Sequence, residues 1–119
     1  MESKGRILIV EDDTAFANLV RRALQQEGYE ATVASDGLTA VELLRTFKPQ
    51  LVCLDMYLPE LNGWEFLKKY AVYLAPHVPI IAVSAANVDR ASLQGVSEFL
   101  QKPFDLTILL KTIDRLLQN

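Results

Sequence analysis

The sequence predicts an α/β fold in which five parallel strands form one sheet and helices cover both of its faces. Two observations carry this prediction: short runs of Val, Ile and Leu alternate with segments of helical periodicity, and the alternation continues along all 119 residues. A strand followed by a helix is a crossover unit, and successive crossovers make the strands parallel. A chain of this length fits one compact domain, which we expect to span residues 1–119.

Short apolar runs mark the five strands. Continuous runs such as ILIV and LVCL are typical of strands that are covered on both faces, whereas EATVA is less apolar and is expected nearer an edge. The predicted strands are residues 7–10, 30–34, 51–54, 79–83 and 97–100.

Apolar residues spaced three and four positions apart predict five helices. Gly28 and Pro49 end the first two helices and Pro76 closes the third, whereas residues 87–94, ended by Gly95, predict only a short fourth helix. The inward positions are Phe16, Leu19, Val20, Ala23 and Leu24 in the first helix, Ala40, Leu43, Leu44 and Phe47 in the second, and Leu67, Tyr70, Ala71 and Leu74 in the third. The last helix has the stripe Leu106, Leu109, Leu110, Ile113, Leu116 and Leu117.

Composition excludes several classes of protein. Hydrophobic residues make up 50% and charged residues 23% of the chain, which is an ordinary globular profile. The net charge of −3 argues against direct nucleic-acid binding. The single cysteine, Cys53, excludes an internal disulfide and is expected to be a buried apolar residue. Because there is neither a membrane-length apolar run nor a signal peptide, we expect a cytoplasmic protein that does not bind membranes.

Polar residues follow four of the predicted strands. They are Glu11, Asp12 and Asp13 after the first strand, Asp55 after the third, Ser84 after the fourth and Lys102-Pro103 after the fifth. In open parallel sheets, binding sites form outside the carboxyl ends of the strands, so these side chains are expected to meet. Converging carboxylates need a cation, and oxygen ligands without nearby His or Cys favour Mg²⁺. An ammonium and a hydroxyl beside them suit a phosphoryl group, with one carboxylate as nucleophile.

Four motifs then give the chain a resemblance to the response-regulator receiver domains of two-component signalling. They are ILIVEDD at 7–13, DMYLPELNG at 55–63, VSA at 83–85 and EFLQKPF at 98–104. They stand in the family's order and cover nearly the whole chain. The resemblance implies a flavodoxin-like (βα)5 doubly wound sheet with strand order 2-1-3-4-5. It also implies a phospho-acceptor signalling domain that catalyses only its own phosphorylation and dephosphorylation.

The resemblance also implies roles for individual residues. Asp55 would accept a phosphoryl group from a phosphohistidine, and Ser84 and Lys102 would hold the phosphoryl oxygens. The Mg²⁺ ligands would be Glu11, Asp12, Asp55 and the backbone carbonyl of Tyr57. Ser84 and Phe99 would form the switch, and the Lys102–Pro103 bond would be cis.

Two departures from the family pattern concern the output side of the domain. Ser84 and Phe99 stand where the family often has threonine and tyrosine, so the hydroxyl-based readout of the switch is altered. The segment between Ser84 and Lys102 is about one helical turn shorter than usual, which shortens the fourth helix. The implied partners are a sensor histidine kinase or histidine phosphotransfer protein and a downstream output domain or protein, and a homodimer stays open.

Two alternative functions stay open from the sequence. A pseudo-receiver would bind proteins without being phosphorylated, although the complete set of acids, Ser84 and Lys102 opposes it. A Mg²⁺-dependent aspartyl-phosphate phosphatase of the haloacid-dehalogenase type shares the nucleophile, but Tyr57 stands where those enzymes have a second acid. We further expect Asp13 to serve only as an N-cap, Trp64 to pack at the helix surface, and the Tyr57 ring to shield a phosphoryl group from water.

Overall fold

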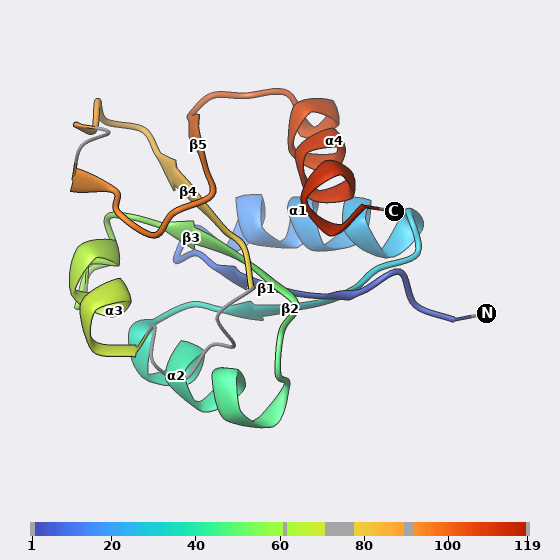
Figure 1. Cartoon of the computed structure of the whole chain (residues 1–119), viewed down its shortest axis with the longest axis horizontal. Helices are drawn as coiled ribbons and strands as arrows, with labels where there is room; N and C mark the ends of the chain where they lie inside the picture. The colour runs from blue at the N-terminus through green and yellow to red at the C-terminus, as the bar shows by residue number, and fades with distance from the viewer. Residues whose placement is uncertain (1, 61, 71–77, 90–91, 119) are drawn as a thin grey trace.

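The computed structural model describes residues 2–60, 62–70, 78–89 and 92–118, and it has an α/β architecture (Figure 1). One parallel sheet has the strand order β2-β1-β3-β4-β5. Its strands are β1 (Arg6–Val10), β2 (Glu30–Ala34), β3 (Leu51–Asp55), β4 (Ile80–Ser84) and β5 (Glu98–Gln101). The helices of the described ranges are α1 (Thr14–Gln26), α2 (Gly37–Thr46), α3 (Gly63–Tyr70) and α4 (Leu106–Leu117). The predicted fold class and strand order are confirmed.

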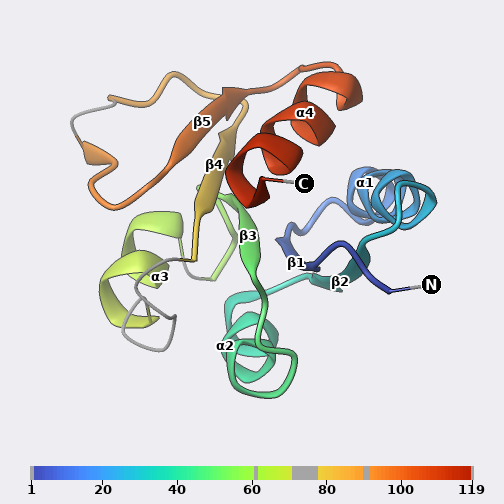
Figure 2. The same ribbon diagram turned by 45° about the vertical axis from the view of Figure 1, so that its right-hand side comes forward.

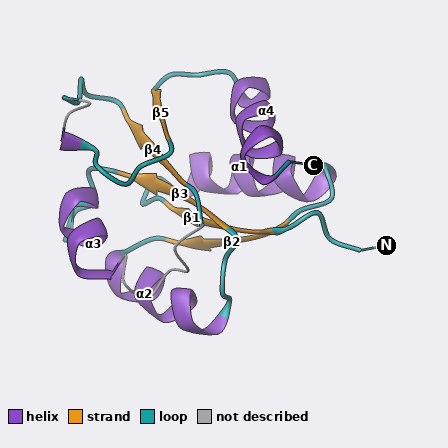
Figure 3. Cartoon of the chain, in the orientation of Figure 1, coloured by secondary structure: helices purple, strands orange, loops and turns teal. Residues whose placement is uncertain are grey.

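The helices form two layers, with α1 and α4 on one face of the sheet and α2 and α3 on the other (Figures 1 and 2). Alternate side chains of each central strand point to opposite layers, and both sets are buried. The strand residues facing α2 and α3 are Leu8, Val10, Val52, Leu54, Ile80 and Ala82. Those facing α1 and α4 are Ile7, Ile9, Leu51, Cys53, Ile81 and Val83. Figure 3 shows the strands between the two helical layers, and burial on both faces explains why the central strands are continuous apolar runs.

The strand register places several polar residues at one edge of the sheet. The register pairs nearest this edge are Val10 with Leu54, Asp55 with Val83, and Ser84 with Gln101. Glu11 directly follows β1 and Lys102 directly follows β5. The carboxyl ends of β1, β3, β4 and β5 therefore bring Glu11, Asp55, Ser84 and Lys102 to the same side of the molecule.

Side-chain caps mark the start of α1, α2 and α3, whereas Asp105 before α4 makes no side-chain cap hydrogen bond. Asp13 before α1 and Asp36 before α2 each accept the backbone N–H three residues further on, at 3.1 Å and 2.7 Å. Asn62 Oδ1 accepts the N–H of Glu65, whose carboxylate in turn accepts from Asn62 Nδ2. The prediction that Asp13 is an N-cap is confirmed. Among the helices of the described ranges, none combines the length and the apolar character needed to cross a bilayer.

The connection between β4 and β5 differs from the sequence prediction. Residues 87–89 are irregular and Ser92 lies in a 3₁₀ turn, so the predicted helix 87–94 does not form in the described part of this connection. The backbone N–H and the hydroxyl of Ser92 both donate to the carbonyl of Asp89, at 2.9 Å and 2.6 Å. These bonds tie Ser92 to Asp89 within the range of the predicted helix. The label α4 consequently belongs to the helix that follows β5.

Two predicted helix faces also need correction. Leu19 was placed on the inward face of α1, but it is 49% exposed. The buried stripe of α1 is Ala17, Val20 and Leu24, which is narrower than the predicted face. In α3 Phe66 is fully buried although it was not among the predicted inward positions, whereas the predicted Leu67 is half-buried and packs against the same apolar cluster. The predicted inward positions Ala71 and Leu74, the side chain of Tyr70 and the closing Pro76 lie outside the described residues.

The two ends of the chain lie together at the amino edge of the sheet. The Tyr29 hydroxyl donates to Asp114 Oδ1 in α4. Lys4 Nζ lies 4.0 Å from the same oxygen. A Cβ atom added to Gly5 would lie 3.2 Å from Leu117 Cδ1. The segment before β1 is therefore anchored on the end of α4.

Candidate functional site

Three carboxylates meet at the carboxyl edge of the sheet. Asp55 ends β3, and Glu11 and Asp12 directly follow β1. One carboxylate oxygen from each of the three lies within 4.8 Å of the other two. Glu11 and Asp55 are buried, at 3% and 8% exposure, whereas Asp12 is open to solvent. Because three like charges at this separation repel one another, the cluster is suited to a hard cation with oxygen ligands.

Lys102 brings a positive charge to this cluster. Its Nζ donates to Glu11 Oε1 at 2.5 Å and lies 3.6 Å from Asp55 Oδ2. The same ammonium lies 4.7 Å from the ring centroid of Phe16, which meets the Phe104 ring edge-on. Lys102 thus links the ends of β1, β3 and β5, and two aromatic rings wall it on the α1 side.

Burial and charge act in opposite directions on the Glu11–Lys102 pair. Burial raises the pKa of Glu11, and the hydrogen bond from Lys102 only partly offsets this effect. Burial by itself would lower the pKa of Lys102, but the hydrogen bond and charge of Glu11, together with the charge of Asp55, raise it overall. Lys102 therefore stays an ammonium, and the raised pKa of Glu11 means that burial disfavours its charged form.

Asp55 and Ser84 are oriented by backbone groups. Asp55 Oδ1 accepts the N–H of Tyr57 at 3.0 Å. Ser84 is fully buried, and its Oγ accepts the N–H of Ala86 at 3.1 Å. The Ser84 carbonyl accepts the N–H of Lys102 at 2.8 Å, which ties the end of β4 to the end of β5. The Lys102–Pro103 peptide bond is cis, as the family resemblance implies.

Four further residues that the sequence analysis singled out lie outside the cluster of three carboxylates. The Tyr57 side chain is 51% exposed and its ring meets Trp64 edge-on at 5.4 Å between centroids. Phe99 is half-buried and packs against the apolar cluster under α2 and α3. Asp13 serves as the cap of α1 and is absent from the three-carboxylate cluster. The prediction for Cys53 is confirmed, because it is 5% exposed.

The loop between Asp55 and α3 is closed by a contact that the sequence did not reveal. The N–H of Gly63 donates to the carbonyl of Met56 at 2.7 Å. A Cβ atom on Gly63 would lie only 2.5 Å from Met56 Sδ and 2.8 Å from Met56 Cα. The sequence predicts a turn here, but the need for glycine depends on a fully buried methionine whose position no periodicity signals.

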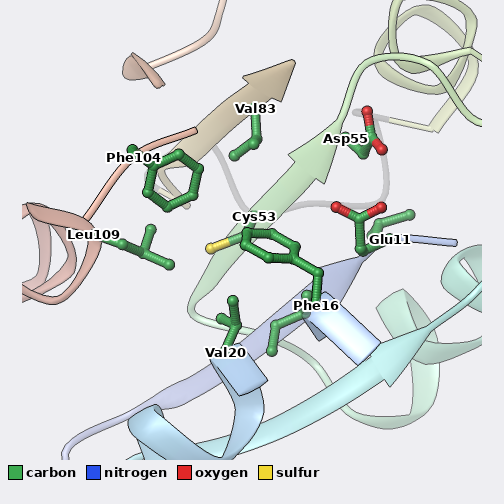
Figure 4. A pocket seen from close by; sticks show the side chains of 10 residues that line it. Glu11, Phe16, Val20, Cys53, Asp55, Val83, Phe104 and Leu109 are labelled. Carbon is green, nitrogen blue, oxygen red and sulfur yellow. The ribbon is translucent and has the colours of Figure 1, made fainter. Parts of the chain in front are cut away.

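Two hollows adjoin the site. A small hollow of about 20 Å³ lies beneath the carboxylates, where Cys53, Phe16 and Phe104 face one another (Figure 4). It has room for about one water molecule, but its lining is mostly apolar. An open hollow of about 340 Å³ lies beside Lys102, between the start of α1 and Pro103. The carboxylate cluster is thus accessible from one side and closed by packed apolar groups below.

A family model describing the response regulator receiver domain matches residues 7–114. The chain belongs to this family. Regulatory protein VanRB of Enterococcus faecalis is 34% identical over 118 residues, which cover 96% of this receiver chain and 53% of VanRB. DNA-binding transcriptional regulator NtrC of Bradyrhizobium is 32% identical over 117 residues, covering 95% of this chain and 24% of NtrC. The receiver spans about half or less of the length of these two curated relatives.

Solved receiver structures agree with the family assignment. The receiver domain of the hybrid histidine kinase CckA superposes with a TM-score of 0.83 at 33% identity, covering 96% of this chain and 100% of the other. A CheY-like response regulator receiver protein from Methanospirillum hungatei superposes with a TM-score of 0.89 at 28% identity, covering 99% and 95%. The chain is therefore a signalling domain of two-component systems.

Proposed function

We propose that this receiver accepts a phosphoryl group on Asp55 from the phosphohistidine of a sensor histidine kinase or a histidine phosphotransfer protein. The observation that carries the proposal is the set of three carboxylates within 4.8 Å of one another, with Lys102 Nζ 3.6 Å from Asp55 Oδ2. A carboxylate at the end of a rigid central strand, close to an ammonium, is a nucleophile held in position.

The donor set fits Mg²⁺, because it consists of oxygen atoms only and includes a solvent-facing carboxylate. Glu11, Asp12, Asp55 and the carbonyl of Tyr57 would hold the ion. When bound, Mg²⁺ would supply positive charge that neutralises the phosphoryl oxygens.

Different residues of the chain would have different roles in the phosphoryl transfer. An Asp55 oxygen attacks phosphorus, the P–N bond to the donor imidazole breaks, and its electron pair returns to the imidazole nitrogen. Lys102, already between Glu11 and Asp55, and the Ser84 hydroxyl bind the phosphoryl oxygens. To do so the Ser84 hydroxyl turns away from the N–H of Ala86, and Phe99 follows as the second switch residue.

The signal would then pass to an output domain or protein. Support for this comes from relatives such as NtrC, which is named a DNA-binding transcriptional regulator and of which the chain matches only 24%. Residues 1–119 would form the phospho-acceptor domain of such a system, acting in the cytoplasm, with a homodimer as one possible output form.

The direct test is incubation of the protein with Mg²⁺ and acetyl phosphate, followed by intact-mass measurement. We expect a gain of about 80 Da that is lost in Asp55→Asn. Asp13→Asn is the matched control, because asparagine preserves the α1 cap, and it should keep the gain. Absence of the gain in the unaltered protein would favour a pseudo-receiver. Sustained release of phosphate from small phosphate esters would favour a phosphatase.

A further inference from the structure

The feature behind this inference is a short chain of contacts that leads from Asp55 to the β4–β5 connection. The N–H of Tyr57 binds Asp55 Oδ1 at 3.0 Å. The Tyr57 ring meets the Trp64 ring edge-on, with centroids 5.4 Å apart. Trp64 Nε1 donates to Ser92 Oγ at 3.0 Å, across 28 residues of sequence. Each contact involves one defined pair of groups.

The loop geometry explains why these contacts can transmit a displacement. The Gly63 N–H to Met56 carbonyl bond closes the loop, so Tyr57 at its start lies beside Trp64 at its end. The Asn62–Glu65 pair fixes the first turn of α3, to which Trp64 belongs. The position of Tyr57 therefore depends on how the Trp64 ring is oriented.

Trp64 is half-buried against the apolar cluster that faces α2 and α3, but part of its surface borders a hollow. A hollow of about 230 Å³ lies between α3 and the turn at residues 92–95, and Trp64, Lys68, Ser92 and Gln94 are among its lining residues. Figures 1 and 2 both show this turn close to α3. The ring is therefore held by core packing on one part of its surface and by the hydrogen bond to Ser92 at Nε1.

We propose that Trp64 is a positioning residue, which Ser92 anchors and which holds the Tyr57 backbone against Asp55. This inference rests on the proposed phosphorylation of Asp55, because Tyr57 supplies both an N–H to the Asp55 carboxylate and the carbonyl proposed to face Mg²⁺. The lifetime of the phosphoryl group then depends on the β4–β5 connection. Because the Tyr57 backbone contacts Asp55 and the Tyr57 ring contacts Trp64, we also expect phosphorylation to change the environment of Trp64.

Three variants separate the parts of this contact chain. Ser92→Ala removes the acceptor together with the hydroxyl bond to the Asp89 carbonyl, Trp64→Phe removes only the donor and keeps an aromatic ring, and Ser92→Thr keeps a hydroxyl. The matched control is Gln94→Ala, which alters the same hollow without removing the hydrogen bond. After labelling with radioactive acetyl phosphate, the first-order loss of label from Asp55 is followed for each variant, together with its melting temperature.

Ser92→Ala and Trp64→Phe should each change the half-life of the phosphoryl group by about three- to tenfold, which is the range that one ordinary hydrogen bond can supply. Ser92→Thr and Gln94→Ala should stay close to the unaltered protein. In a Tyr57→Ala background, Ser92→Ala should have no further effect, because the contact chain is already broken. A merely structural role for Ser92 would instead lower the melting temperature equally in both backgrounds.

A second readout uses the single tryptophan of the chain. Because Trp64 is that residue, its emission should shift in Ser92→Ala and again when the unaltered protein is phosphorylated. If the unaltered protein takes up label while its half-life is the same in Ser92→Ala and Trp64→Phe, the positioning role is overturned and the proposed function stands. If the unaltered protein takes up no label, both are overturned.

Discussion

The positive charge of Lys102 compensates only part of the negative charge of the site. Lys102 is the cation that approaches both Glu11 and Asp55 in the described contacts, and it has three carboxylates to neutralise. Burial leaves Glu11 with a raised pKa even with this partner. The site therefore carries excess negative charge in the absence of a metal ion, and this repulsion opposes folding. A site built for a cation is expected to reduce stability when the cation is missing.

Asp12 offers a test of this repulsion. Asp12→Asn removes one of the three charges while Lys102 keeps both of its contacts, because neither involves Asp12. We expect the free energy of unfolding in EDTA to rise by about 1 kcal/mol, and the affinity for Mg²⁺ to fall. Thermal unfolding with EDTA and with a Mg²⁺ series measures both effects. Asp13→Asn is the control, and a lower stability of Asp12→Asn in EDTA would show that the charge is not repulsive.

At the scale of elements, the strands were predicted better than the connections. The β2 bounds match the predicted residues 30–34, and the remaining strands differ by a residue or two at their ends. Strand runs are local and both faces are buried, so composition alone marks them. The prediction of a helix in the β4–β5 connection was wrong. The path of this connection depends on specific hydrogen bonds, such as the one from Ser92 to Asp89, and these leave no periodic pattern in the sequence.

The loop from β3 to α3 should tolerate no side chain at Gly63. Gly63→Ala places a methyl group against the backbone and sulfur of Met56, at 2.8 Å and 2.5 Å. We expect it to lower the free energy of unfolding by about 2 kcal/mol or more. Gly95→Ala is the control, because its Cβ meets nothing within 4 Å and its cost comes only from a φ of +85°. Denaturant unfolding compares the two, and an equal or smaller loss in Gly63→Ala would refute the close contact.

The cap of α2 should make stability depend on pH. Hydrogen bonding to the Thr39 backbone lowers the pKa of Asp36 below its ordinary value of 3.8. A carboxyl whose pKa is lower in the folded state adds stability that is present above pH 3.8 and is lost as the pH falls through the folded-state pKa.

Asp36→Asn keeps an oxygen acceptor but cannot titrate. The unaltered protein should be more stable than Asp36→Asn at pH 7, and the difference should disappear below pH 3.8. Melting temperatures of both proteins across this range provide the measurement. A difference that stays constant down to the most acidic pH would argue against the charge-assisted cap.

At the scale of the whole molecule, the parallel topology allowed the position of the site to be predicted from the sequence. The contacts between the side chains of the site could not be predicted in this way. Strand order brings every residue after a strand to one edge, so Glu11, Asp55 and Lys102 could be grouped from sequence alone. Which atoms touch depends on side-chain conformation, and the direct Glu11–Lys102 bond was not foreseen. The hydrogen bond from Trp64 to Ser92 joins the first turn of α3 to the β4–β5 connection, and nothing in the sequence indicates that these two segments meet.

Cys53 can report the unfolding of the whole sheet. It lies in the central strand β3, is 5% exposed, and burial raises its pKa to about 12. A disulfide reagent at pH 8 should therefore modify it only through global unfolding, whereas reaction in guanidinium should be immediate.

Mg²⁺ at about a hundred times its dissociation constant should slow this modification by about a hundredfold, because it binds only the folded state. The Asp55→Asn protein should show a smaller Mg²⁺ effect. Rapid modification of the native protein, or a rate that Mg²⁺ leaves unchanged, would contradict the coupling between the site and the sheet.

The contact between Gly5 and the end of α4 has a consequence for the connectivity of the fold. Because the first and last described segments touch at the edge opposite Asp55, a short flexible peptide could join them without disturbing the carboxylate cluster. New termini could then open within the exposed part of the β4–β5 connection. A circular permutant of this kind would keep every strand of the sheet while interrupting the connection that carries Ser92. It would therefore test whether the carboxylate site needs the natural order of the sequence.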